Sequence, residues 1–342
     1  MNHKNDSPFI IPIFLPHSGC PHRCIFCNQT AITGTASGCF TVEALHSTVH
    51  RFLKLKGERQ QVIQVAFYGG NFLGLKKKVI KRLLDECTTL VKTGAIHSVR
   101  FSTRPDTIHI ESLEFINDYP VSTIEIGAQS MDDQVLMMAK RGHTAEHTEK
   151  AVRLLQDKKY EVGLQIMVGL PGDNESKALA TTQTIVRLSP SFTRIYPTIV
   201  LANSLLAGWY QQGKYTPWPL GRCVNIVKKM YLLFQANNIP VIRMGLQATK
   251  DLEKGSTIVA GPYHPSFGHL VHAAIFFDKA TDALTSAKGS RENVSIGVNP
   301  NSISKMRGLN NSNVNRLKKQ FHLKSLRVVP DPTLLADQLT IM

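Results

Sequence analysis

Three cysteines stand within eight positions near the start of the chain. Cys20, Cys24 and Cys27 lie on a segment that also contains Gly19 and Pro21. Thiols this close together on a loop-forming segment predict convergence on a metal ion or an iron–sulfur cluster rather than packing in a hydrophobic core. A four-iron cluster normally takes four cysteines, so a three-cysteine loop would leave one iron open to a non-protein ligand. The spacing therefore favours a site that performs chemistry on a bound cofactor.

A structural zinc ion is the alternative for the same cysteines. Zinc takes four ligands, usually from two Cys-x-x-Cys-like pairs that lie far apart in the sequence. Cys24 and Cys27 make one such pair, and no second pair follows downstream. The other three cysteines are scattered and no signal peptide precedes them, so disulfides are not expected.

Length and composition predict a globular protein in a reducing compartment. The 342 residues are enough for one large α/β domain or two ordinary ones, and 42% of them are hydrophobic. No apolar run approaches the ~20 residues that a membrane helix needs. We therefore expect a cytoplasmic protein with no membrane association, a location that suits an oxygen-sensitive cluster.

The chain is strongly basic, with a formal net charge of +15. An excess of this size attracts polyanions, RNA above all, although it can also serve only to keep the surface solvated. A cluster at residues 76–82 is expected to be the solvated face of a helix. A second cluster near the C-terminus is a candidate for contacts with phosphates or for a solubilising tail. It consists of Lys305, Arg307, Arg316, Lys318, Lys319, Lys324 and Arg327.

Six short runs rich in apolar residues alternate with amphipathic helical segments. The runs cover residues 10–15, 62–67, 99–102, 123–128, 162–167 and 194–197. Nearly continuous apolar strands separated by helices indicate parallel strands that are covered on both faces. Six βα units are too few for a closed eight-stranded barrel. The predicted fold is therefore α/β, a partial (β/α)6 barrel of the TIM type with a C-terminal extension.

Polar motifs follow these predicted strands. The cysteine loop comes after the first strand, residues 68–71 after the second, 103–106 after the third, 129–130 after the fourth and 169–172 after the fifth. In barrels of this type the active site lies at the carboxyl ends of the strands. We therefore expect all of these motifs to meet at one rim.

The spacing Cys-x-x-x-Cys-x-aromatic-Cys, with Phe26 as the aromatic residue, resembles the signature loop of the radical SAM enzymes. The resemblance implies a [4Fe-4S] cluster on Cys20, Cys24 and Cys27 that binds S-adenosylmethionine (SAM) at its open iron. It also implies reductive cleavage of SAM to a 5′-deoxyadenosyl radical. The electron would come from a donor of the flavodoxin or ferredoxin type.

The same resemblance implies further cofactor-binding residues. Tyr68, Gly69 and Gly70 stand where the family binds the SAM amino group through backbone carbonyls, although an ordinary turn would also explain the glycine pair. Asn71 follows, where many members of the family have an acidic residue or a threonine. Arg141 would suit the SAM carboxylate, because a guanidinium can bind a carboxylate through two parallel hydrogen bonds.

Two polar residues inside predicted strands are also candidates. Glu125 lies in an apolar strand, where an unpaired carboxylate is costly. It could reach the ribose hydroxyls or the methionyl amine of SAM, or it could form a buried ion pair with Arg100 or Arg104. Gln165 in the fifth strand could flank the adenine or be only a buried amide. No residue is assigned a catalytic role.

Further motifs narrow the resemblance to one branch of the superfamily. Residues 102–106, 124–130, 141–144 and 195–200 follow one another in the order found in the radical SAM half of the Elongator catalytic subunit, Elp3. The match extends over about residues 8–245 and implies modification of an RNA base, in tRNA. The chain differs in its compact cysteine spacing and in showing no pyrophosphate loop of an acetyltransferase. We therefore expect a stand-alone, Elp3-like protein without the acetyltransferase domain.

The expected organisation has three parts. A radical SAM core covers residues 1–245, an Elp3-like extension covers 246–285 and includes a turn-rich loop at 260–267, and a polar, basic and loosely packed tail covers 286–342. Two other functions remain open at this point. One is a porphyrin-type radical SAM oxidoreductase, and the other is a zinc-bearing nucleic-acid-binding protein without redox chemistry.

Metal content distinguishes the cluster from zinc. Protein reconstituted anaerobically with iron and sulfide is expected to be brown and to cleave SAM to 5′-deoxyadenosine and methionine when dithionite supplies electrons. Cys24→Ala should abolish both the colour and the cleavage, because a cubane cannot be held by two thiolates of this loop. A colourless protein with one stoichiometric zinc would contradict the cluster.

Overall fold

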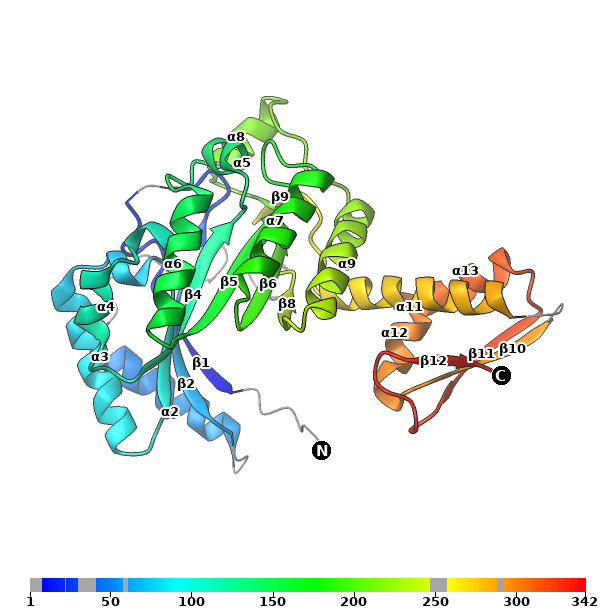
Figure 1. Cartoon of the computed structure of the whole chain (residues 1–342), viewed down its shortest axis with the longest axis horizontal. Helices are drawn as coiled ribbons and strands as arrows, with labels where there is room; N and C mark the ends of the chain where they lie inside the picture. The colour runs from blue at the N-terminus through cyan, green and yellow to red at the C-terminus, as the bar shows by residue number, and fades with distance from the viewer. Residues whose placement is uncertain (1–7, 22, 30–40, 58–60, 247–256, 288–291) are drawn as a thin grey trace.

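The computed structural model describes residues 8–21, 23–29, 41–57, 61–246, 257–287 and 292–342 (Figure 1). Within these residues, a sheet of seven parallel strands in the order β1-β2-β3-β4-β5-β6-β8 curls into a half-barrel. Each strand lies beside the one before it, as βα units with short crossovers do. The strands are β1 Phe9–Phe14, β2 Ile63–Tyr68, β3 Ser98–Thr103, β4 Val121–Gln129, β5 Glu161–Val168, β6 Phe192–Pro197 and β8 Val241–Met244.

Helices cover the convex face of this sheet (Figure 1). The main ones are α2 Val42–Lys56, α3 Lys77–Lys92, α6 Ala145–Asp157, α7 Glu175–Leu188 and α9 Leu220–Ala236. In β5 the alternation of side chains separates two environments. Leu164 and Ile166 are buried in the core between sheet and helices, whereas Gln165 and Met167 lie half-buried on the concave face.

The predicted partial barrel is confirmed, and each of the six predicted strands falls within one of the observed strands or overlaps it closely. The seventh strand, β8, was missed. It is only four residues long and contains Arg243, so it carries little apolar signal. Its parallel pairing with β6 identifies it as part of the sheet.

The short helix α4 Ile110–Ile116 connects β3 to β4 and packs against the barrel core. Other short elements follow strands β4 to β8, and they are α5 Asp133–Met138, α8 Leu205–Gln211, β7 Val200–Leu201 and β9 Ile258–Ala260. β7 and β9 pair antiparallel, and the loop predicted at 260–267 leads from β9 directly into the next helix. No helix in the described residues is long and apolar enough to cross a membrane.

The last part of the chain is a folded unit, and the expectation of a loosely packed tail is wrong for its described residues. A sheet in the order β11-β10-β12 has helices on one face (Figure 1). We call residues 267–342 the C-terminal module. Its elements are α11 Phe267–Ser286, β10 Asn293–Val298, α12 Ile303–Arg307, α13 Ser312–Gln320, β11 Ser325–Pro330 and β12 Leu339–Ile341.

The module has a small core of its own. Val294, Ile296 and Val298 alternate along β10 and are buried against Met306 and Leu317 of the helices. The sequence concealed this core because single apolar residues are separated by asparagine, serine and lysine. The buried apolar residues nevertheless meet in one cluster, so a few of them suffice for a three-stranded sheet with helices on one side.

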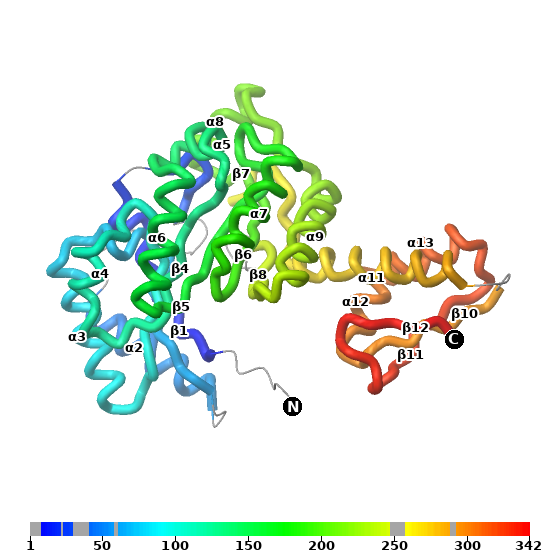
Figure 2. The backbone as a smooth tube through the Cα atoms, viewed as in Figure 1, coloured from blue at the N-terminus to red at the C-terminus, as the bar shows by residue number. Residues whose placement is uncertain are grey.

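One helix belongs to both cores. In its first half, α11 contributes Phe267, Val271 and Ile275 to the core of the barrel. In its second half, Phe276 and Ala280 belong to the core of the module. The module is therefore attached through a continuous helix, which extends sideways from the barrel in Figure 2.

Truncating Leu317 is expected to unfold the module locally. Leu317 is fully buried, and Leu317→Ala should cost about 2–5 kcal/mol from lost burial and the cavity that remains. Hydrogen exchange measured by mass spectrometry should accelerate in β10 and β11 and stay unchanged in β4 and β5, because the two cores are separate.

The matched control is Leu309→Ala in the same module. Leu309 is 42% exposed, so its truncation should change stability by about 0.5 kcal/mol or less. Equal acceleration for both variants, or acceleration that extends into the barrel, would contradict a separate core.

Candidate functional site

The cysteine loop is held to the sheet by backbone hydrogen bonds on both sides. Leu15 N–H donates to the carbonyl of Tyr68 at 2.7 Å, and His17 N–H donates to that of Gly69 at 3.0 Å. Further along, Ile25 N–H donates to the carbonyl of Ala139 at 3.1 Å. The loop is therefore fixed to the end of β2 at its beginning and to the end of α5 near its middle.

Glycine is required where the loop crosses the end of β2. A Cβ on Gly70 would lie 2.5 Å from the carbonyl oxygen of Ser18 and 2.6 Å from that of Leu15. A Cβ on Gly19 would lie 2.2 Å from the carbonyl oxygen of Asn71, and Gly19 also has φ of +73°. Gly70 and Gly19 thus allow the cysteine loop to cross close to the end of β2, a role that the sequence did not suggest.

The three thiols lie close enough to influence one another. Burial, followed by the neighbouring Cys24 sulfur, raises the pKa of the Cys27 thiol to about 12. Burial and Cys24 also raise the pKa of the Cys20 thiol, whereas Arg104 and Arg141 lower it. Three sulfur donors with two nearby guanidinium groups fit a cluster held by thiolates, since cations stabilise the ionised sulfur.

The described residues contain no group of three His, Cys, Asp or Glu side chains already arranged to hold a metal ion. The cysteines fit the cluster by donor type and by loop anchoring. His22 and residues 30–40 lie outside the described residues.

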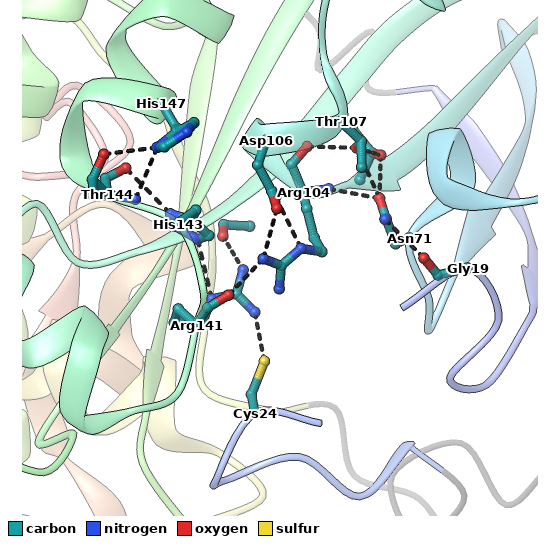
Figure 3. Close-up of polar contacts among 12 residues, drawn as sticks. Gly19, Cys24, Asn71, Arg104, Asp106, Thr107, Arg141, His143, Thr144 and His147 are labelled. Carbon is teal, nitrogen blue, oxygen red and sulfur yellow. Dashed lines mark hydrogen bonds and ion pairs between the residues drawn. The ribbon is translucent and has the colours of Figure 1, made fainter. Parts of the chain in front are cut away.

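Arg141 connects the cysteine loop to β4 (Figure 3). Its guanidinium is buried, and Nη1 donates to Cys24 Sγ at 2.9 Å while Nη2 donates to the carbonyl of Gly127 at 2.5 Å. Nε donates to His143 Nε2 at 3.2 Å. Burial, reinforced by the charge of Arg141, lowers the pKa of His143 to about 3. His143 is therefore neutral at physiological pH and can accept this hydrogen bond.

Arg104 lies behind Arg141 and is paired with Asp106. Its Nε and Nη2 donate to the two Asp106 oxygens, each at 2.9 Å, and Nη2 also donates to the carbonyl of Arg141 at 2.5 Å. Burial raises the pKa of Asp106, but the hydrogen bonds and charge of Arg104 outweigh it and hold the pKa below its usual value. The buried Nη1 of Arg104 has no hydrogen-bond partner among the described residues.

Asn71 was noted in the sequence only as a departure from the family pattern, and its structural role was not predicted. Its side chain is fully buried at the end of β2, and Nδ2 donates to the carbonyl of Gly19 at 2.9 Å. Oδ1 accepts from the Thr103 hydroxyl at 2.7 Å, from Arg104 N–H at 3.0 Å and from the Thr107 hydroxyl at 3.0 Å. One amide thus ties the cysteine loop to the end of β3 (Figure 3).

Glu125 takes part in a buried ion-pair network on the concave face. Its carboxylate lies 2.9 Å from Arg194 Nε and 3.6 Å from Arg100 Nη1, and it accepts from the Tyr68 hydroxyl at 2.9 Å. The expected ion pair with Arg100 is present, and the alternative partner Arg104 is engaged elsewhere. Burial, followed by the charge of Glu125, raises the pKa of Tyr68, which keeps the hydroxyl a donor. The partner that was not predicted is Arg194. A charged residue inside the strand β6 was the sequence signal that could have indicated it.

The remaining predicted residues lie nearby without direct contacts to one another. Gln165 is half-buried on β5, in register between Gly127 of β4 and Arg194 of β6. Phe26 is partly buried and packs against the small cluster that includes Leu170. The structure thus joins Arg141 to Cys24 and Tyr68 to Glu125, with Gln165 in the same row as Arg194.

Comparisons with known proteins match the half-barrel and the segment that follows it. The family model described as "Radical SAM superfamily" matches residues 14–185, and the one described as "Radical_SAM C-terminal domain" matches residues 190–276. The tRNA uridine(34) acetyltransferase of Dehalococcoides mccartyi (strain CBDB1) is 27% identical over 243 residues, covering 61% of this chain and 52% of the relative. Elongator complex protein 3 of Drosophila melanogaster is 26% identical over 209 residues, covering 54% and 38%. The chain thus spans about half the length, or less, of these relatives.

Solved structures share the fold. The archaeal Methanocaldococcus infernus Elp3 with an N-terminal deletion has a TM-score of 0.60 at 18% identity, covering 80% of this chain and 63% of that one. HydG, a maturase of the [FeFe]-hydrogenase, has a TM-score of 0.52 at 15% identity, covering 77% and 55%. At these identities the likeness concerns the fold alone.

Asn71→Ala is expected to disorganise the cysteine loop. The change removes the donor to the Gly19 carbonyl and leaves the buried Arg104 N–H without its acceptor. The Thr103 and Thr107 hydroxyls keep their contacts with each other and with the Arg104 carbonyl. Each buried group that stays unpaired costs about 1–3 kcal/mol. Iron content after reconstitution and SAM cleavage should both fall by tenfold or more. Asn71→Asp keeps the acceptor and should retain more iron than the alanine variant.

Asn117→Ala serves as the control, because Asn117 is exposed beyond the opposite end of the sheet. It should leave iron content unchanged. Normal iron loading and cleavage in Asn71→Ala would show that the amide does not position the loop.

Proposed function

The chain belongs to the radical SAM superfamily, and we propose that it holds a [4Fe-4S] cluster on Cys20, Cys24 and Cys27 and modifies a base in tRNA. The observation that carries the proposal is the three-thiol loop fixed at the rim of the half-barrel by Asn71 and Arg141. Superfamily membership indicates an enzyme and implies SAM as its cofactor. It decides against a zinc-bearing binding protein without redox chemistry.

The residues of the chain would position the cofactors and exclude water. When bound, the cluster and SAM supply an electron and a 5′-deoxyadenosyl radical for hydrogen abstraction. Tyr68, Gly69 and Gly70 lie beside the cysteine loop. The Tyr68 and Gly69 carbonyls accept from Leu15 and His17 N–H, and their remaining lone pairs, with the Gly70 carbonyl, would accept from the methionyl amine. Arg141 would offer its charge to the carboxylate in addition to its contacts with His143, Cys24 and Gly127, and Gln165 would offer an amide for the adenine.

Glu125 is proposed as a positioning residue. Its oxygens accept hydrogen bonds from Tyr68 and Arg194, which fixes the orientation of the Tyr68 side chain beside the SAM region. An ion pair buried this deeply is costly to break, because removing one partner leaves an uncompensated charge. The network would therefore keep the concave face rigid while the ribose hydroxyls of SAM lie against it.

Two observations support tRNA as the substrate. Relatives over the matched region are named for tRNA uridine(34) acetyltransferase and Elongator complex protein 3. The net charge of +15 favours a polyanionic partner. A reductant of the flavodoxin or ferredoxin type would complete the reaction.

Nucleoside analysis of tRNA tests this function. Total tRNA from a strain lacking the gene should contain less of one modified nucleoside than wild-type tRNA when digests are compared by mass spectrometry. The wild-type gene should restore the nucleoside and Cys24→Ala should not. Identical nucleoside profiles, with SAM cleavage intact, would overturn tRNA as the substrate and leave the radical chemistry in place.

Arg141→Ala should weaken SAM binding to cluster-loaded protein. Loss of a hydrogen bond to a charged group costs ~1.5–3 kcal/mol, or roughly tenfold to a hundredfold in affinity. Calorimetry measures the affinity for SAM. Arg141→Lys should recover part of this affinity, because lysine keeps the positive charge but lacks the paired donors of a guanidinium. Arg153→Ala, on the exposed part of α6, is the control. Unchanged SAM affinity in Arg141→Ala would refute the carboxylate assignment.

A further inference from the structure

The C-terminal module carries an uninterrupted basic segment. Between Ile303 and Arg327 there are seven lysines and arginines and no aspartate or glutamate. Lys324 pairs with Glu292 at 2.5 Å, and the guanidinium of Arg316 lies 3.8 Å from the centre of the Phe277 ring. Five others have no ion pair in the part of the chain that the structure describes. These are Lys305, Arg307, Lys318, Lys319 and Arg327.

Helix α13 presents three of these cations to solvent. Leu317 is buried in the core of the module, so Lys319 lies on the opposite side of the helix. Arg316 is three residues before Lys319 and shares its face, and Lys318 borders it. The exposed Asn315 adds an amide to the same side. We call these four residues the α13 face.

From this arrangement we propose that the α13 face binds the phosphate backbone of an RNA whose other end lies at the rim of the half-barrel. Lysine and arginine side chains neutralise phosphates, and amides such as that of Asn315 donate hydrogen bonds to phosphate and sugar oxygens. The helix belongs to a folded module, so its cations are displayed at fixed spacing and lose less freedom on binding than those of a disordered tail. That the RNA is a tRNA rests on the proposed function.

The placement of the module requires an extended partner. α11 has 20 residues and is therefore about 30 Å long, and it extends sideways from the barrel (Figures 1 and 2). In Figure 1 the carboxyl ends of the strands point upward, and α13 lies along the upper side of the module. A small substrate cannot touch both places, whereas a folded RNA can.

Topology favours RNA over an acidic protein such as the electron donor. β1, which carries the cysteine loop, forms one edge of the seven-stranded sheet, and β8 forms the other. α11 packs at the β8 side, next to α9. A donor docked on the α13 face would therefore hold its redox centre at the edge of the barrel far from the cysteine loop.

The test compares two double variants of the cluster-loaded, full-length protein. Lys318→Gln with Lys319→Gln removes two charges from the α13 face, and Lys76→Gln with Lys78→Gln removes two exposed charges from the start of α3. Anisotropy of a fluorescent tRNA transcript, and of an unstructured RNA of mixed sequence, is measured over a series of salt concentrations.

The slope of log affinity against log salt should become shallower by about 1.5 in the α13 variant, since each lost phosphate contact accounts for ~0.7–0.9. Both RNAs should be affected alike, because phosphate contacts position without specifying sequence. The α3 variant should keep the wild-type slope. The single variant Lys319→Glu should weaken both RNAs in the same direction, and circular dichroism should show unchanged folding for all variants.

Three results would overturn the proposal. These are equal slopes in the two double variants, no binding of either RNA by the wild type, and loss of flavodoxin-driven SAM cleavage in the α13 variant with RNA binding intact. The last would identify the α13 face as a surface for the donor. Dithionite-driven cleavage, measured in parallel, reports the radical chemistry separately, so failure of RNA docking and failure of the proposed function can be told apart.

Discussion

The amide of Asn71 is the contact on which the candidate site depends. The cysteine loop follows β1, an edge strand, so only one neighbouring strand is available to hold it. Asn71, at the end of that neighbour, binds the loop through Gly19 and binds the end of β3 through Thr103 and the Arg104 backbone. Asn71, Thr103 and Arg104 are buried, and a missing partner would cost the full desolvation of a polar group. One side chain therefore couples three consecutive strand ends.

Two networks of arginine side chains also fix the candidate site, one at the rim and one on the concave face. At the rim, Asp106 orients Arg104, which contacts the backbone of Arg141, and Arg141 reaches Cys24. On the concave face, Glu125 holds Arg194. Ion pairs buried to this degree are weak arguments for stability, because desolvation offsets much of their attraction. Their value here lies in geometry, since each places a cation or a hydroxyl at a fixed position beside the cofactor region.

In the proposed function, the C-terminal module would separate chemistry from partner recognition. Its core is independent of the barrel, yet α11 contributes apolar side chains to both, so the two parts are joined by a stiff element. Basic side chains at the far end of such an element can contact a large substrate without altering the rim. The proposed enzyme would then combine a half-barrel that generates the radical with a module that contributes electrostatic affinity.

The sequence by itself determined the elements whose signal is local. Six apolar strands, the helices between them and the Cys20–Cys27 loop are recognisable because period, spacing and residue type are properties of short segments. Only the tertiary structure decided four contacts of the candidate site. These are the pairing of Arg104, the hydrogen bonds of Asn71, the contact of Arg141 with Cys24 and the pairing of Glu125 with Arg194. Asn71 and Arg104 are 33 positions apart, Glu125 and Arg194 are 69 apart, and Cys24 and Arg141 are 117 apart, so no local pattern links them. Asp106 lies two positions from Arg104, but Glu125 was an alternative partner of that arginine. The module was hidden for the same reason, since Val294, Met306 and Leu317 form a core only after the chain has folded back on itself.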